Sequence, residues 1–152
     1  MELWDAYDRE LNKLGGVTLV RGEEVPDGMY HLVSEVIVKH TDGEFLLMQR
    51  APTKHFGGMW EATAGGSALC GESPLDFTRI GTVVHDGHRS IYAEFLCVTD
   101  HDKNSVRLQT GETAASKWVG FEKLKSMEAE LASVRCLHSY YEYGESNGNN
   151  QI

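Results

Sequence analysis

The sequence has only three cysteines, and they lie far apart. Cys70, Cys97 and Cys136 form no CxxC pair, which excludes the common zinc-binding spacings and a disulfide framework. We interpret them as small thiols that are buried or half-buried in the fold.

The sequence also lacks a long apolar stretch, since no run approaches the roughly 20 residues that a membrane-spanning helix needs. Its first ten residues, MELWDAYDRE, are acidic and polar, which is not typical of a signal peptide. We therefore expect a cytoplasmic location and no membrane partner.

Positive charge is scarce. The chain carries 14 Lys and Arg residues against 23 Asp and Glu residues, which gives a net charge of −9. A nucleic-acid polymer is not expected as a partner, because binding it requires a basic surface that displaces counterions. A small phosphorylated ligand remains possible, because it needs only a few local cations or a metal ion.

The length and composition are those of an ordinary globular domain. The chain has 152 residues, of which 41% are hydrophobic and 24% charged, enough for a real core. Neither an internal repeat nor a domain boundary is visible. We predict one domain over residues 1–143 and a disordered polar tail over residues 144–152.

Residues 56–73, FGGMWEATAGGSALCGES, form a glycine-rich stretch around which the rest of the chain is organised. Its five glycines allow unusual backbone angles and close approach by another group. The apolar residues between them, including Met59 and Trp60, are not expected in a solvated linker. We interpret the stretch as an ordered loop near a functional site. An irregular surface loop is the alternative.

The remaining pattern is rich in β-strands. Residues 30–40 and 44–50 flank Asp42-Gly43, which predicts a β-hairpin. A second pair is expected from residues 80–85 and 91–99 across Asp86-Gly87-His88. Shorter extended segments are predicted at residues 3–7, 17–21, 106–109 and 116–119, with a turn over residues 8–16.

One long helix is predicted over residues 121–143, because apolar residues such as Leu124, Leu131 and Leu137 recur at steps of three and four. Several strands with one long helix near the C-terminus indicate a mixed α and β layer fold.

At the glycine-rich stretch the chain resembles the Nudix hydrolase superfamily. The motif of that family, the Nudix box, begins with Gly, five residues and Glu, and residues 66–72 match this part. Residues 3–73 and 80–125 resemble the isopentenyl-diphosphate-isomerase-like branch and its hydrolase relatives. The resemblance implies an α/β fold, a Nudix-like α/β/α sandwich with a mixed β-sheet.

The second half of the Nudix box is missing from the sequence. Ile80 stands where the family has an arginine, and Gly81 stands where it has a glutamate. No glutamate lies between Asp76 and Glu94, so the metal-binding glutamates of the family are absent here. We expect the box helix to be shortened or absent.

The resemblance implies a pyrophosphatase that depends on Mg²⁺ or Mn²⁺ and acts on a small diphosphate or nucleotide. Hard divalent cations need several oxygen ligands. By resemblance, the Gly66 carbonyl provides one of them, and Glu72 matches the first glutamate of the box. In the family that glutamate usually braces the box arginine, which this sequence lacks. A merely solvated Glu72 is therefore the alternative.

Five further residues are candidates for the site. Glu112 lies where some family members place a general base. Arg50 ends a predicted strand beside the glycine-rich stretch and can hold a phosphate with two parallel hydrogen bonds. The resemblance places Trp60 and Glu61 near the substrate cleft, and Gly65 is a further candidate for contact with substrate. The alternatives are a solvated turn for Glu112, a surface charge for Arg50 and a core anchor for Trp60.

Histidine is a common metal ligand, and the candidates for such a role are His31 and the trio His85, His88 and His101. In the isomerase branch a histidine near His31 is a metal ligand. The second histidine of that branch and its catalytic cysteine have no match, so isomerase activity is not expected.

Three hypotheses follow. The chain is a Nudix-type hydrolase of a nucleoside diphosphate linked to another moiety, with activity impaired by the missing glutamates. Alternatively, it is a catalytically inactive module that binds or senses a nucleotide or diphosphate. In the third hypothesis, the chain lacks a segment that the native protein has. A homodimer is possible, because exposed edge strands often pair with a second copy.

Overall fold

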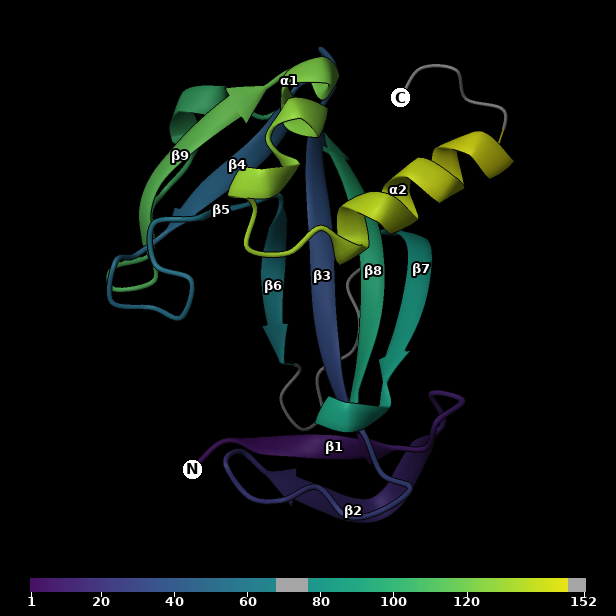
Figure 1. Cartoon of the computed structure of the whole chain (residues 1–152). Coiled ribbons are helices and arrows are strands. Elements are labelled where there is room, and N and C mark those ends of the chain that lie inside the picture. The colour runs from purple at the N-terminus through teal and green to yellow at the C-terminus, as the bar shows by residue number, and fades with distance from the viewer. Residues whose placement is uncertain (68–76, 148–152) are drawn as a thin grey trace. The chain divides into compact units, whose positions relative to one another are not determined.

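The computed structural model describes residues 1–67 and 77–147 and combines strands with two short helices (Figure 1). The strands are β1 (Leu3–Tyr7), β2 (Lys13–Val20), β3 (His31–His40), β4 (Phe45–Arg50), β5 (Trp60–Glu61), β6 (Thr63–Ser67), β7 (Thr78–His85), β8 (Ser90–Thr99) and β9 (Thr113–Val119). The helices are α1 (Phe121–Ser126) and α2 (Arg135–Ser146), with 3₁₀ turns η1 (Asp86–His88), η2 (Lys103–Ser105) and η3 (Glu128–Glu130). None of the described helices has the length and apolar character needed to cross a membrane.

The strands form two sheets. β1 and β2 pair in one, and the order of the larger sheet is β5-β4-β3-β8-β7, with β6 paired to β3 and β9 paired to β4. The predicted β-hairpin is confirmed, since β3 and β4 are antiparallel with Lys39 opposite Phe45. Gly43 has a φ of +97°, an angle that glycine adopts readily, which explains the Asp-Gly pair at this turn. The predicted mixed α/β class is therefore observed.

The chain divides into two compact units. Unit 1 consists of Met1–Glu35 and Gly65–Phe95, and unit 2 consists of Val36–Ala64 and Leu96–Ile152. The single domain over residues 1–143 stays a prediction.

Unit 1 contains the antiparallel pair of β1 and β2, in which Trp4 lies opposite Leu19. Trp4, Ala6 and Leu19 are buried together. β2 begins at Lys13, within the predicted turn. The turn is shorter than predicted, because the Asp8 carboxylate accepts hydrogen bonds from the backbone N–H groups of Glu10 and Asn12 and so closes the turn over a few residues.

The other hairpin of unit 1 joins β7 to β8, which are neighbours in the sheet as predicted. Its connection is the 3₁₀ turn η1, followed by Arg89 with a φ of +51°. The nine residues before Phe77 lie outside the described part of the chain. The shortened or absent box helix therefore stays a prediction.

In unit 2 the aromatic ring of Phe45 on β4 packs against Phe121 of α1 and Tyr140 of α2. The single helix predicted over residues 121–143 is wrong in its extent. The helix breaks after Ser126 because Leu131 forms a β-bridge with Trp60 and the Ala132 N–H donates to the Trp60 carbonyl.

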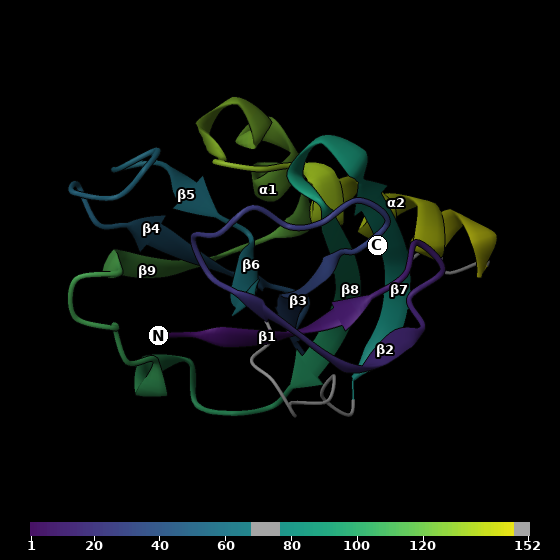
Figure 2. The same ribbon diagram turned by 90° about the horizontal axis from the view of Figure 1, so that it is seen from below.

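The strand predictions in unit 2 are partly right. Figure 2 shows β4 between β5 and β9, which pair with it at Met48 and Gln49. The predicted segment 116–119 lies within β9, whereas residues 106–109 form no strand. α2 extends to Ser146, so residues 144–146 of the predicted tail are helical; residues 148–152 lie outside the described part.

Candidate functional site

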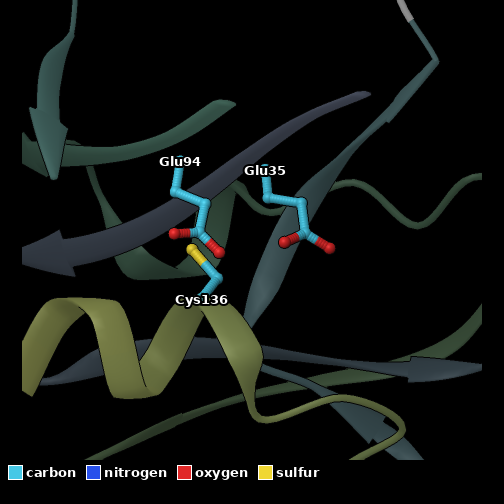
Figure 3. Close-up of side chains that lie close together, drawn as sticks. All are labelled: Glu35, Glu94 and Cys136. Atoms are coloured by element: carbon cyan, nitrogen blue, oxygen red, sulfur yellow. The ribbon is translucent and has the colours of Figure 1, made fainter. Parts of the chain in front are cut away.

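Two glutamates converge inside unit 1. Glu35 lies on β3 and Glu94 lies on β8, and these strands are neighbours in the sheet. A carboxylate oxygen of Glu35 lies within 4.8 Å of one from Glu94. Glu94 has no exposed surface, and Glu35 is half-buried. We call these two residues the acidic pair; Figure 3 shows both side chains, together with Cys136 of unit 2.

The chemistry of the acidic pair suits a hard divalent cation. Mg²⁺ is usually held by one or two carboxylates, with water and substrate phosphates as the remaining ligands. The two carboxylate oxygens lie within 4.8 Å of each other, so a small side-chain adjustment would let both reach one ion at Mg²⁺–oxygen distances of about 2.1 Å. The residues present therefore fit a hard divalent cation such as Mg²⁺.

The acidic pair is not predicted from the sequence, because apolar residues dominate both strands. A signal was nevertheless present, since each glutamate interrupts a segment rich in β-branched and aromatic residues. Charged residues are almost never fully buried without a partner or a function. An acid in the middle of a buried strand was therefore a candidate.

A second group of candidate residues lies in unit 2, where β4 ends. Gln49 pairs with Trp60 and Met48 pairs with Glu61, so the short strand β5 lies directly beside β4. Arg50 Nη1 donates to the Glu61 carboxylate, and Arg50 Nε donates to the His55 carbonyl at 2.7 Å. Within the described part of the chain, these contacts use two of the five guanidinium N–H donors.

The other two predicted residues of unit 2 lie beside lysines. The Lys117 ammonium lies 3.9 Å from the centroid of the Trp60 ring, a cation–π contact. The Lys54 ammonium lies 2.6 Å from the Glu112 carboxylate, and the Ala51 N–H donates to the Glu112 carbonyl. The structure thus brings Arg50 together with Glu61 and Glu112 together with Lys54, while the catalytic role of Glu112 stays a prediction.

The predicted glycines lie on β6, which pairs with β3. A methyl group built on Gly65 would lie 1.9 Å from the Ser34 carbonyl oxygen, so only glycine fits this position without a shift of the backbone. Gly66 follows on the same strand. Glu72 lies outside the described residues, and its predicted role as a metal ligand stays a prediction.

His31 contacts two neighbouring side chains, those of Trp4 and Ser90. Its ring stacks on Trp4 with centroids 4.2 Å apart, and its Nε2 lies 2.8 Å from the Ser90 hydroxyl. His85 and His88 stack on each other beside η1. In the described part of the chain, no histidine belongs to a cluster of three or more potential metal ligands.

The chain is similar in sequence to two curated proteins. An uncharacterized Nudix hydrolase of Listeria innocua is 27% identical over 146 residues, covering 85% of this chain and 86% of the relative. One of Listeria monocytogenes is 38% identical over 74 residues, which cover 48% of this chain. That alignment spans less than half of the relative, 43% of its length. No protein-family model matches the chain.

Solved structures share the fold at low sequence identity. DR0079 from Deinococcus radiodurans matches with a TM-score of 0.68 and 13% identity over 92% of this chain and 98% of the other. The NUDIX domain of Shewanella oneidensis NrtR, solved with ADP ribose, matches with a TM-score of 0.56 and 16% identity over 74% of this chain and 87% of that one. The chain is thus similar in sequence to curated Nudix hydrolases, and it shares its fold with the NUDIX domain of NrtR.

Proposed function

We propose that the protein is a metal-dependent hydrolase of a nucleoside diphosphate linked to another moiety, or of a similar small diphosphate. The observation that carries this proposal is the acidic pair, in which Glu35 and Glu94 approach within 4.8 Å. Mg²⁺ that is bound to substrate phosphates is usually held by one or two carboxylates of the protein.

In this proposal the acidic pair holds the cation. A divalent ion bound there would stabilise the charge that develops on the diphosphate and lower the pKa of a water molecule. Independently of the acidic pair, Arg50 of unit 2 stays a proposed phosphate-binding residue, because its planar guanidinium suits phosphate oxygens. Glu112 is retained as the proposed general base, and it would have to leave the Lys54 ammonium to accept a proton.

The missing second half of the Nudix box predicts a low turnover rate. It also favours the second candidate function, a catalytically inactive module that binds a nucleotide or diphosphate. The cytoplasmic location, the lack of a nucleic-acid partner and a possible homodimer stay part of the proposal. The net charge of −9 is consistent with a small ligand rather than a polyanion.

The test is hydrolysis of ADP-ribose, nucleoside triphosphates, dinucleotide polyphosphates and isopentenyl diphosphate, each with Mg²⁺, Mn²⁺ or a chelator. ADP-ribose comes first because the Shewanella domain was solved with it. We expect slow turnover that the chelator abolishes. The variants Glu35→Gln and Glu94→Gln should lower the rate at least about 100-fold, as is typical when a group that stabilises the transition state is removed.

Glu23→Gln, which changes an exposed glutamate of unit 1, is the matched control and should retain the wild-type rate. Metal binding is measured independently as the rise in melting temperature with Mn²⁺, which should be lost in Glu35→Gln. No turnover of any compound by folded protein would reject the hydrolase. Calorimetric binding of ADP-ribose without turnover would then support the binding module.

A further inference from the structure

Two adjacent aromatic rings lie at the tip of the loop between β4 and β5. Phe56 is 52% exposed, and its ring centroid lies 4.0 Å from that of the His55 ring. We call His55 and Phe56 the aromatic platform. An exposed Phe forgoes most of the burial energy that it would gain in a core, and that apolar surface is available to a ligand.

The backbone under the aromatic platform is unusual. Phe56 has a φ of +56°, in the left-handed region, where a bulky residue is an outlier. Gly57 follows, and a methyl group built on it would lie 2.3 Å from the Pro52 carbonyl oxygen. The loop therefore folds tightly back on itself. Such conformations persist only where the surrounding structure enforces them, and they concentrate at functional sites.

Several contacts hold this loop in place. Its ends are closed by the Arg50 N–H bond to the Met59 carbonyl, at 2.9 Å, and by the Gly58 N–H bond to the Arg50 carbonyl, at 3.1 Å. The Arg50 side chain holds the His55 carbonyl. The platform is therefore fixed by the residue proposed to contact phosphate.

The charges around the platform indicate the chemistry of its ligand. Arg50 keeps three guanidinium N–H donors that no described residue engages, and its side chain is 21% exposed. Lys54 of the same loop is paired with the Glu112 carboxylate, so Arg50 is the cation that offers donors to a ligand here. An exposed aromatic surface beside the guanidinium donors of Arg50 suits a molecule that combines a planar ring with an anionic group.

We propose that His55 and Phe56 stack against the nucleobase of the ligand, while Arg50 binds its phosphate. This inference rests on the proposed function only in taking a nucleotide as the ligand, and it does not require turnover. Stacking contributes affinity without selecting one base, because every base has an aromatic face. The platform therefore predicts a preference for nucleotides over diphosphates that lack a ring.

The test is calorimetric binding of ADP and of inorganic pyrophosphate in chelator, so that neither metal nor hydrolysis contributes. Phe56→Ala should weaken ADP binding about 5- to 150-fold, the range expected for loss of one base–aromatic stack. Its affinity for pyrophosphate should stay unchanged. Phe56→Trp should keep or strengthen ADP binding, and Leu108→Ala, which removes another exposed apolar side chain of unit 2, should have no effect.

Phe56→Gly separates binding from folding. Glycine accepts a positive φ without strain, so this variant should raise the melting temperature while still weakening ADP binding. Equal ADP affinity in wild type, Phe56→Ala and Phe56→Gly would overturn the inference. Wild-type protein that binds pyrophosphate but not ADP, or that binds neither, would also overturn it. Neither binding measurement depends on hydrolysis, so the proposed hydrolase activity and the proposed role of the aromatic platform can be rejected independently of each other.

Discussion

Ser90 and His31 are joined by a hydrogen bond between β8 and β3, with 2.8 Å between Oγ and Nε2. The Ser90 hydroxyl also donates to the His88 carbonyl at 3.0 Å. His31 Nε2 must then be the donor to Ser90, which leaves Nδ1 as the unprotonated nitrogen. That Nδ1 atom is buried and has no hydrogen-bond partner among the described residues.

Acid should destabilise unit 1 through His31, because a second proton on the ring would place a charge at the buried Nδ1. Burial accordingly lowers the pKa of His31 below its ordinary value of 6.5. The unfolded chain therefore binds the proton more readily. The free energy of unfolding should be fully retained above pH 6.5 and should fall as the pH drops from 6.5 through the lower folded pKa.

Urea unfolding of wild type and His31→Gln at pH 7.5 and pH 5.5 measures this effect. Because other histidines titrate in the same range, the relevant quantity is the difference between the two proteins. We expect the wild type to lose more stability than His31→Gln between the two pH values. The same loss in both proteins would contradict the prediction.

Gly65→Ala should destabilise the protein by about 1–3 kcal/mol, the usual cost of forcing an extra carbon into a packed site. The new methyl group would meet the Ser34 carbonyl, a backbone atom that cannot rotate away. Gly15→Ala is the matched control, because a methyl group there would meet no atom within 4 Å. Thermal unfolding of both variants tests the prediction, and equal melting temperatures would refute it.

Arg50→Lys should weaken pyrophosphate binding by about 10-fold or more, since one hydrogen bond to a charged group contributes about 1.5–3 kcal/mol. Lysine keeps the positive charge but lacks the planar fork that lets Arg50 hold the His55 carbonyl and a phosphate at once. Arg107→Lys changes an exposed arginine of the same unit and should leave affinity unchanged. Unaltered binding by Arg50→Lys, measured by calorimetry, would remove Arg50 from the site.

Asp86 should remain ionised at unusually low pH. Its carboxylate accepts hydrogen bonds from Arg9 and from the Tyr30 hydroxyl, which lower its pKa to about 2. The stability that these bonds contribute should be present above pH 3.8 and lost as the pH falls through about 2. An NMR titration of the Asp86 carboxyl carbon measures this pKa, and Tyr30→Phe should raise it. A midpoint near 3.8 in the wild type would contradict the prediction.

The sequence by itself determined the features that depend on neighbouring residues. Asp42-Gly43 between two β-rich runs specified the β3–β4 hairpin, because the turn needs a residue with positive φ. The first half of the Nudix box and its context pointed to the superfamily. The apolar spacing in residues 121–143 marked the residues that are buried, such as Leu124 and Leu137, although the chain there is not one helix.

Only the tertiary structure decided the features that depend on residues far apart in the chain. The acidic pair exists because β3 lies beside β8, which brings positions 35 and 94 together, and no local pattern specifies that neighbour. The break between α1 and α2 arises from pairing of Leu131 with Trp60. Helical periodicity reports which side chains are buried, whereas backbone hydrogen bonds to a distant strand determine where the helix stops.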